Sequence, residues 1–121
     1  MLFERISIGT DIEKISRFEN KNSNDDKDFL AKIFTSKEID YSFSKKKYAQ
    51  HLCARFCAKE AIIKALSEFK IHDVYYRDIE INNEPDGHPN AFIPKYPNIK
   101  IKISLSHNKT DAISMVMLHK E

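Results

Sequence analysis

The longest helical pattern in the chain, over residues 48–69, carries a carboxylate on the side where apolar residues gather. At about 100° per residue, Glu60 falls between Phe56 and Cys53 on the helix surface. A carboxylate on a buried face loses hydration worth several kcal/mol unless a cation, a metal ion or hydrogen bonds replace it. We therefore expect Glu60 to have a specific partner.

Two kinds of partner fit Glu60. Lys64 follows one helical turn later, and a glutamate-to-lysine pair in this order stabilises an exposed helix by only about 0.2–0.5 kcal/mol. The other possibility is a metal ion shared with a second carboxylate elsewhere in the chain. The residues of the helix alone leave both possibilities open.

The size and charge of the chain limit the classes of protein to which it can belong. Its 121 residues are enough for one domain, residues 1–121, with one hydrophobic core. The formal net charge of +2 is too small for a polycation that binds nucleic acid indiscriminately. A basic binding surface, if the protein has one, must be local.

The cysteines and the N-terminus indicate the compartment. Cys53 and Cys57 lie one helical turn apart in an apolar run, with no second cysteine pair, which favours reduced, buried thiols over a disulfide or a zinc site. Glu4 and Arg5 interrupt the N-terminal segment, and no apolar run reaches the ~20 residues of a membrane span. We expect a cytoplasmic protein.

The first half of the chain predicts one strand followed by helices. Residues 2–9 read as a strand that ends at Gly9, which places Asp11 at a strand end. Helical spacing of Ile12, Ile15 and Phe18 then predicts a short amphipathic helix from Asp11, capped by Thr10 or Asp11. A polar loop at 20–26 precedes helical patterns at 29–34, at 35–43, which opens with the capping-box sequence Thr-Ser-Lys-Glu, and at 48–69.

The second half changes to the two-residue period of strands. Strands are predicted at 78–82 and 90–93 around a turn at 85–87, and at 99–106 and 112–118 around a loop at 107–110. Helices followed by strands indicate an α+β fold, with an antiparallel sheet packed on the long helix.

The chain has no phosphate-binding loop, dinucleotide-binding glycine pattern, zinc-ligand pattern or nucleophile elbow. What it offers is a pair of acids, Asp11 and Glu60, with Lys64, and Ser106 and His107 at a strand end. Paired carboxylates with a lysine suit Mg²⁺, which takes one or two protein oxygens and leaves positions for water and substrate phosphates. The set therefore favours chemistry on phosphates.

These residues resemble a known family, the holo-acyl-carrier-protein synthases, which are small phosphopantetheinyl transferases. The resemblance spans nearly the whole chain in the family's order and spacing. The matching segments are Ile8-Gly9-Thr10-Asp11-Ile12 with Ile15-Ser16-Arg17, Ile33-Phe34-Thr35 with Glu38 and Tyr41, Arg55-Phe56-Cys57-Ala58-Lys59-Glu60-Ala61 with Lys64-Ala65-Leu66, and Ser104-Leu105-Ser106-His107.

The resemblance implies a magnesium-dependent reaction in fatty acid biosynthesis. The phosphopantetheine arm of coenzyme A would pass to a serine hydroxyl of acyl carrier protein, leaving adenosine 3',5'-bisphosphate. Asp11 and Glu60 would hold Mg²⁺, and Lys64 would add positive charge beside the phosphates. The base that takes the serine proton stays open among Glu60, a water on the metal and a carboxylate of the carrier protein.

The resemblance also implies the remaining contacts. Residues at the coenzyme A pocket would be Arg55, Lys64, Gly87, Ser106 and His107. A basic stripe of Lys14, Arg17 and Lys21, on the first helix, would dock the acidic helix of acyl carrier protein. Members of this length form homotrimers with active sites between subunits, so the resemblance also implies a homotrimer for this chain.

Three positions depart from the family's usual pattern. His88 stands where a lysine is usual in Gly-Lys-Pro, Ser67 replaces the glycine after Lys-Ala-Leu, and Asn108 replaces the threonine after the histidine. By the resemblance, all three lie at the rim of the pocket and away from the metal pair.

Two other functions fit parts of the pattern. The basic stripe could belong to a non-enzymatic module that binds RNA or an acidic protein, with Glu60 and Lys64 as a structural ion pair. Paired acids with a lysine also suit a metal-dependent phosphodiesterase.

Overall fold

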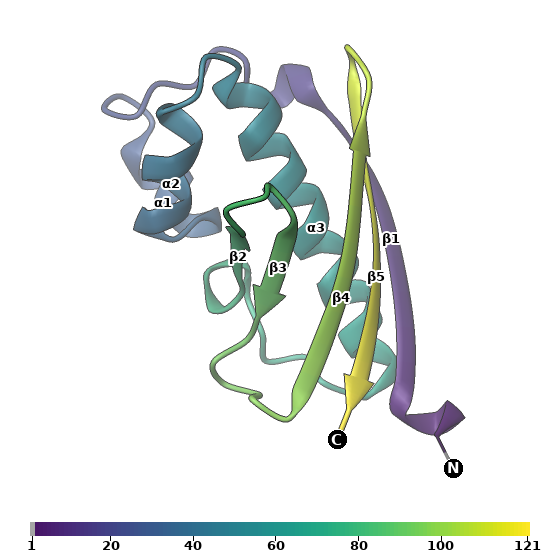
Figure 1. Ribbon diagram of the computed structural model, residues 1–121. Coiled ribbons are helices and arrows are strands. Elements are labelled where there is room, and N and C mark those ends of the chain that lie inside the picture. The colour runs from purple at the N-terminus through teal and green to yellow at the C-terminus, as the bar shows by residue number, and fades with distance from the viewer. Residues whose placement is uncertain (1) are drawn as a thin grey trace.

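Helix α3, Tyr48–Glu68, lies between two layers of the molecule (Figure 1). The computed structural model describes residues 2–121. One layer is a three-stranded antiparallel sheet in the order β1-β5-β4, made of β1 (Ile6–Lys14), β5 (Asp111–Lys120) and β4 (Ile99–His107). The other contains α1 (Lys27–Ile33), α2 (Ser36–Phe43) and a hairpin of β2 (Glu80–Asn83) and β3 (Pro89–Phe92). Short 3₁₀ helices, η1 (Phe3–Arg5), η2 (Ile15–Phe18) and η3 (Tyr76–Asp78), complete it.

The predicted α+β fold, with an antiparallel sheet on a long helix, is confirmed. The capping box is also present, because Thr35 Oγ1 accepts a hydrogen bond from the Glu38 amide and the Glu38 carboxylate accepts one from the Thr35 amide. No helix among residues 2–121 is both long and apolar enough to cross a bilayer.

The predictions for residues 2–18 are wrong at both ends of the strand. Residues Phe3–Arg5 form η1, so β1 begins only at Ile6. Strand β1 does not end at Gly9 but continues through Asp11 to Lys14, and within residues 9–18 the predicted helix is reduced to the short turn η2. The reason is non-local: β1 pairs with β5 along its whole length, from Ile6 opposite His119 to Lys14 opposite Asp111. This ladder satisfies the backbone groups that a helix from Asp11 would have paired internally.

Gly9 is needed for contact with α3 and not for a turn. A β-carbon at Gly9 would lie 2.1 Å from the carbonyl oxygen of Ala61 and 3.3 Å from the Ala65 β-carbon. The strand and the helix are therefore in backbone contact at this point. The other residues of β1 that face α3 are polar: Ser7, Asp11 and Glu13.

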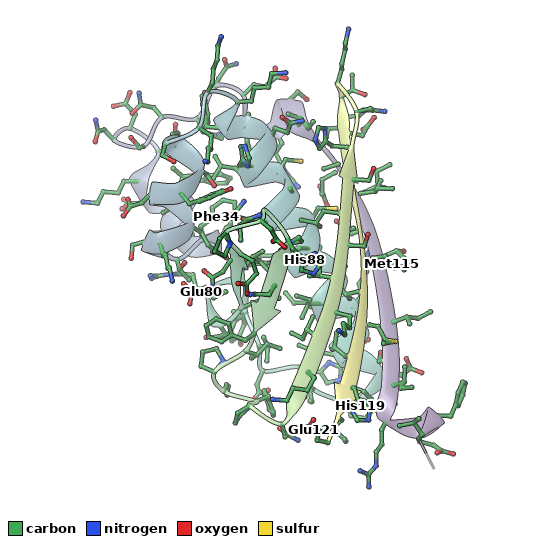
Figure 2. All side chains as sticks on the ribbon, in the orientation of Figure 1. Phe34, Glu80, His88, Met115, His119 and Glu121 are labelled. Carbon is green, nitrogen blue, oxygen red and sulfur yellow. The ribbon has the colours of Figure 1, made fainter. Side chains whose placement is uncertain are left out.

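The opposite face of the sheet is apolar and open to solvent. It is contributed mainly by β1 and β5, and we call it the outer apolar face. Its members, with the exposed fraction of each, are Ile8 (69%), Ile12 (64%), Ile113 (48%), Met115 (59%) and Met117 (41%). Met115 is labelled in Figure 2.

A buried ion pair joins α3 to the second layer. Lys59 and Glu38 are both fully buried, with Lys59 Nζ 2.6 Å from Glu38 Oε1. The ammonium also donates to the carbonyls of Ile33 and Tyr76, at 2.8 and 2.9 Å. Glu38 Oε2 accepts from the Ile81 amide at 2.7 Å. Each of the two charges thus has an opposite charge and further hydrogen bonds, which is the condition under which a buried charge is tolerated.

The two cysteines are free and buried, as predicted. Cys57 Sγ lies 3.2 Å from the Asp11 carbonyl oxygen and 3.3 Å from Ser114 Oγ. Burial raises the pKa of Cys53 to about 12 and that of Cys57 to about 11. Both thiols are therefore protonated in the folded chain over the physiological range.

Replacing Gly9 by alanine should destabilise the fold strongly, because the new methyl group overlaps the Ala61 carbonyl. We expect a loss of about 3 kcal/mol or more in the free energy of unfolding, measured by urea denaturation. Gly87→Ala is the matched control. Its φ of +92° makes alanine unfavourable, but the space around it is open, so it should cost only about 1–2 kcal/mol. Equal losses would contradict the close contact.

The thiols should make stability fall at alkaline pH. Their pKa values in the folded chain lie above the ordinary value of about 8.5, so their contribution is complete below that pH and is lost as the pH rises toward 11–12. Urea denaturation between pH 8 and 10 measures this loss, and a chain with Cys53→Ala and Cys57→Ala should lose less over the same interval. Rapid reaction of either thiol with a disulfide reagent in the native chain at pH 8 would argue against their burial.

Candidate active site

Asp11 lies on the face of β1 that meets α3, and Lys64 reaches it from the helix. The Asp11 side chain is 9% exposed, and its Oδ1 lies 2.8 Å from Lys64 Nζ. The same ammonium donates to the Thr10 carbonyl at 3.2 Å. The hydrogen bond to Asp11 raises the pKa of Lys64, so the lysine side chain stays protonated. Of the two partners considered for Glu60, Lys64 therefore pairs with Asp11 instead.

The second oxygen of Asp11 has no partner. Oδ2 is buried and accepts no hydrogen bond from any described residue. A buried carboxylate oxygen without a donor is unusual in proteins and points to a missing ion or water. The residues around it therefore fit a cation, and oxygen ligands of this kind suit Mg²⁺.

Glu60 is half-buried on α3, and its partner is a hydroxyl group. Tyr76 Oη, in η3, donates to Glu60 Oε1 at 2.5 Å. Burial first, and the hydrogen bond to Glu60 second, raise the pKa of Tyr76 to about 12, which keeps the phenol protonated as a donor. The sequence does not identify Tyr76 as a partner of Glu60, because no pattern near residue 76 points back to residue 60.

A third carboxylate, Glu13, was also missed. It follows Asp11 by two positions on the same strand face, and Arg17 Nη1 lies 2.9 Å from its Oε1. Burial, and then the neighbouring Asp11 carboxyl, raise the pKa of Glu13 to about 7. Glu60 contributes in the same direction, so the three acids place excess negative charge between β1 and α3. A strand drawn past Gly9 would have shown Glu13 beside Asp11.

Asp11 and Glu60 are the residues that could share a metal ion. No group of three or more histidine, cysteine, aspartate or glutamate side chains with the geometry of a metal site occurs among residues 2–121. Two protein carboxylates would leave most of an octahedral coordination shell to other ligands, which is how Mg²⁺ is usually held beside phosphates.

The three basic residues predicted for carrier-protein docking do not share a helix. Lys14 ends β1, Arg17 lies in η2, and Lys21 follows η2. Arg17 is closest to the acids, since its guanidinium lies 5.0 Å from the centre of the Phe56 ring and pairs with Glu13. The three residues therefore lie along the end of β1 and the turn that follows it, and the prediction that they share one helix is wrong.

Of the residues predicted for coenzyme A, Ser106 and Lys64 lie together with Asp11. A cavity of about 560 Å³ is lined by all three, and Ser104 adds a second hydroxyl. Its apolar wall consists of Ile12, Leu105, Ile113 and Met115. The cavity thus joins the acid–lysine pair to the outer apolar face.

The other predicted coenzyme A residues, Arg55, Gly87 and His107, do not line this cavity. Arg55 is 3% exposed and its guanidinium stacks over the Tyr41 ring at 4.4 Å, with Nε unpartnered. Gly87 lies in the exposed β2–β3 turn, next to the His88 labelled in Figure 2. His107 ends β4 and its ring contacts the Gln50 side chain.

A basic cavity lies near His107, at the start of α3. It has a volume of about 330 Å³ and is lined in part by Lys46, Lys47, Gln50 and Lys109. Neither Asp11 nor Glu60 lines it, so it is separate from the acids within one chain.

Comparison with known proteins gives a consistent result. The 4'-phosphopantetheinyl transferase superfamily matches residues 7–116. The chain is 41% identical to the holo-[acyl-carrier-protein] synthase of Thermodesulfovibrio yellowstonii over 92% of this chain and 96% of that one. It is 35% identical to the enzyme of the same name from Clostridium novyi, over 93% and 86% of the two chains.

Solved structures agree with the sequence matches. A holo-(acyl-carrier-protein) synthase from Bacillus anthracis, in complex with coenzyme A (3',5'-ADP), superposes with a TM-score of 0.79 at 28% identity, over 95% of this chain and 96% of that one. The Helicobacter pylori synthase in complex with coenzyme A gives 0.76 at 28% identity, over 92% and 98%. The chain therefore belongs to the 4'-phosphopantetheinyl transferase superfamily, among the holo-[acyl-carrier-protein] synthases.

Proposed function

We propose that this chain transfers phosphopantetheine from coenzyme A to a serine of acyl carrier protein, with Asp11, Glu60 and Lys64 at its catalytic centre. One observation is the main support for this catalytic centre. Asp11 Oδ2 is buried without a hydrogen-bond partner, and the Lys64 ammonium lies beside the same carboxylate. Family membership supports the reaction, and the two coenzyme A complexes of its relatives support the donor.

Asp11 and Glu60 would hold Mg²⁺ between β1 and α3. When bound, the ion would supply positive charge to the pyrophosphate of coenzyme A, which reduces the repulsion met by an attacking oxygen. Asp11 would bind through Oδ2, which needs no displacement of Lys64 from Oδ1. Glu60 would bind through the oxygen that Tyr76 does not occupy.

Lys64 would act on the substrate phosphates. Its side chain is 56% exposed and lines the cavity that also contains Ser106. The ammonium can therefore swing from Asp11 toward a bound phosphate while remaining a cation. In the reaction the serine hydroxyl gives its proton to a base, for which Glu60 and a carboxylate of the carrier protein are candidates. The serine oxygen forms a bond to the phosphorus that carries the pantetheine arm, and the bond from that phosphorus to the leaving bisphosphate breaks.

The remaining contacts follow from the resemblance to the family. Arg55, Gly87, Ser106 and His107 would contact coenzyme A, and Lys14, Arg17 and Lys21 would contact the acidic carrier protein. The lysines of the 330 Å³ cavity offer an additional site for the 3'-phosphate. We further propose that the protein works in the cytoplasm, in fatty acid biosynthesis, where both substrates of this reaction would meet.

The outer apolar face supports a homotrimer with active sites between subunits. A contiguous row of exposed isoleucine and methionine side chains on one sheet marks an interaction surface. Three residues of that face, Ile12, Ile113 and Met115, also line the 560 Å³ cavity. A neighbouring copy that covered the face would therefore close the cavity beside Asp11 and Lys64.

Asp11→Ala and Glu60→Ala should each abolish transfer and leave the chain folded. We expect a loss of roughly 100-fold or more in rate, because the charge that offsets the pyrophosphate is lost. Mass spectrometry of apo acyl carrier protein with coenzyme A and Mg²⁺ measures the addition of phosphopantetheine, and circular dichroism checks the fold. Asp73→Ala, which removes an exposed carboxylate paired with Lys95, is the control and should keep full activity.

Each alternative function predicts a different result. A phosphodiesterase would release nucleotide from coenzyme A with no carrier protein present. A binding module would give no mass increase, and its affinity for RNA would fall steeply with salt. Unchanged transfer in Asp11→Ala or Glu60→Ala would contradict the proposed centre.

Charge on the outer apolar face should dissociate the trimer. Met115→Asp places a carboxylate in the middle of that face, and we expect sedimentation to show a monomer with reduced transfer. Phe92→Asp is the control, since Phe92 is a 43% exposed apolar residue on β3, outside the face. A wild-type chain that sediments as a fully active monomer would rule the trimer out.

A further inference from the structure

Tyr76, in η3, contacts the acid pair through Glu60 on α3. Its backbone belongs to the segment between α3 and β2, and its side chain reaches back to α3. There the hydroxyl donates to Glu60 Oε1 at 2.5 Å. Among the hydrogen bonds of residues 2–121, this is the one that the Glu60 carboxylate accepts. Tyr76 therefore orients that carboxylate.

The position of Tyr76 is fixed by the core and not by solvent. Its carbonyl oxygen accepts a hydrogen bond from Lys59 Nζ at 2.9 Å, and that ammonium is fully buried against Glu38. Its ring packs on Phe56, with ring centres 5.4 Å apart. A side chain held at both its backbone and its ring presents its hydroxyl in one place, because few rotamers remain open to it.

An uncharged donor suits the needs of a metal ligand. A lysine or arginine at this position would compete with a cation for the Glu60 charge, whereas a phenol orients the carboxylate and leaves its charge in place. The hydroxyl occupies Oε1 only, which leaves Oε2 for another ligand. Asp11 shows the same division, with Lys64 on Oδ1 and no partner on Oδ2.

We propose that Tyr76 is a positioning residue of the metal site, which orients Glu60 through its hydroxyl group so that the free carboxylate oxygen meets the ion held by Asp11. This inference rests on the proposed magnesium site. It assigns a role to the hydroxyl, and not merely to the aromatic ring, of residue 76.

The test compares Tyr76→Phe with Tyr96→Phe. Both changes delete a hydroxyl that donates to a carboxylate, since Tyr96 Oη donates to Asp73 Oδ1 at 2.7 Å on the surface. The affinity for Mn²⁺ would be measured from the electron paramagnetic resonance signal of the free ion, with coenzyme A bound. We expect Tyr76→Phe to weaken Mn²⁺ binding by about tenfold, as is usual when a hydrogen-bond partner of a ligand is removed. Tyr96→Phe should match the wild type.

Two further readouts separate positioning from folding. The thermal unfolding midpoint of Tyr76→Phe should stay close to that of Tyr96→Phe. Transfer by Tyr76→Phe should show a KM for Mg²⁺ about tenfold higher, with kcat recovered at saturating Mg²⁺. If the midpoint falls well below that of the control and added Mg²⁺ does not restore kcat, the hydroxyl is structural and the proposal is overturned.

Glu60→Gln distinguishes this inference from the site on which it rests. If Glu60→Gln weakens Mn²⁺ binding but Tyr76→Phe does not, the magnesium site stands and the role of Tyr76 is overturned. If Glu60→Gln leaves Mn²⁺ affinity unchanged, Glu60 is not a ligand, and the site and the role of Tyr76 fall together. Weaker binding in both variants supports both.

Discussion

The backbone contact between β1 and α3 determines where the chemistry of this protein can be. Gly9 lies so close to the Ala61 carbonyl that no side chain fits between them. Asp11 is two residues further along the same strand face, and Glu60 and Lys64 lie on either side of Ala61 on the helix. Bringing the two backbones together at Gly9 therefore places one acid from the strand beside an acid and a lysine from the helix.

The same contact explains the unusual faces of the sheet. Because the helix-facing side of β1 is used for a glycine and polar groups, the large apolar residues Ile8 and Ile12 point outward. An isolated chain would leave them in water, which is unfavourable by roughly 25 cal/mol per Å² of apolar surface that a partner could cover. One face of β1 thus contributes to the proposed catalytic centre, and its other face exposes apolar residues that a partner could cover.

The second layer holds the helix from the other side. The Lys59–Glu38 pair ties α3 to the ends of α1 and α2, to η3 and to β2 through a set of buried hydrogen bonds. Since Lys59 precedes Glu60 directly, the residue that anchors the helix and the proposed metal ligand share one turn. Rigid support of this kind is what a site needs if its ligands are to stay in place before substrate binds.

Local patterns in the sequence predicted the helices and most strands. The presence of a carboxylate on an apolar helix face indicated that Glu60 needs a specific partner. The capping box of Thr35 and Glu38 and the alternation over residues 99–106 are decided by neighbours in sequence, so they could be read directly. The extent of β1 could not, because Ile12, Ile15 and Phe18 match a helix, and only pairing with β5 decides otherwise. For the same reason Glu13, Tyr76 and the Asp11 partner of Lys64 were missed, since each depends on contacts across the fold.

The most direct test of the account is to locate the metal ion by its effect on backbone amide signals. Substoichiometric Mn²⁺ added to the isotope-labelled chain broadens NMR signals of nuclei near the ion. We predict that amides around Asp11 and Glu60 broaden first, while those of the exposed pair Asp73 and Lys95 stay sharp. Broadening centred elsewhere, with the Asp11 and Glu60 signals unchanged, would contradict the claim that the β1–α3 contact builds the metal site.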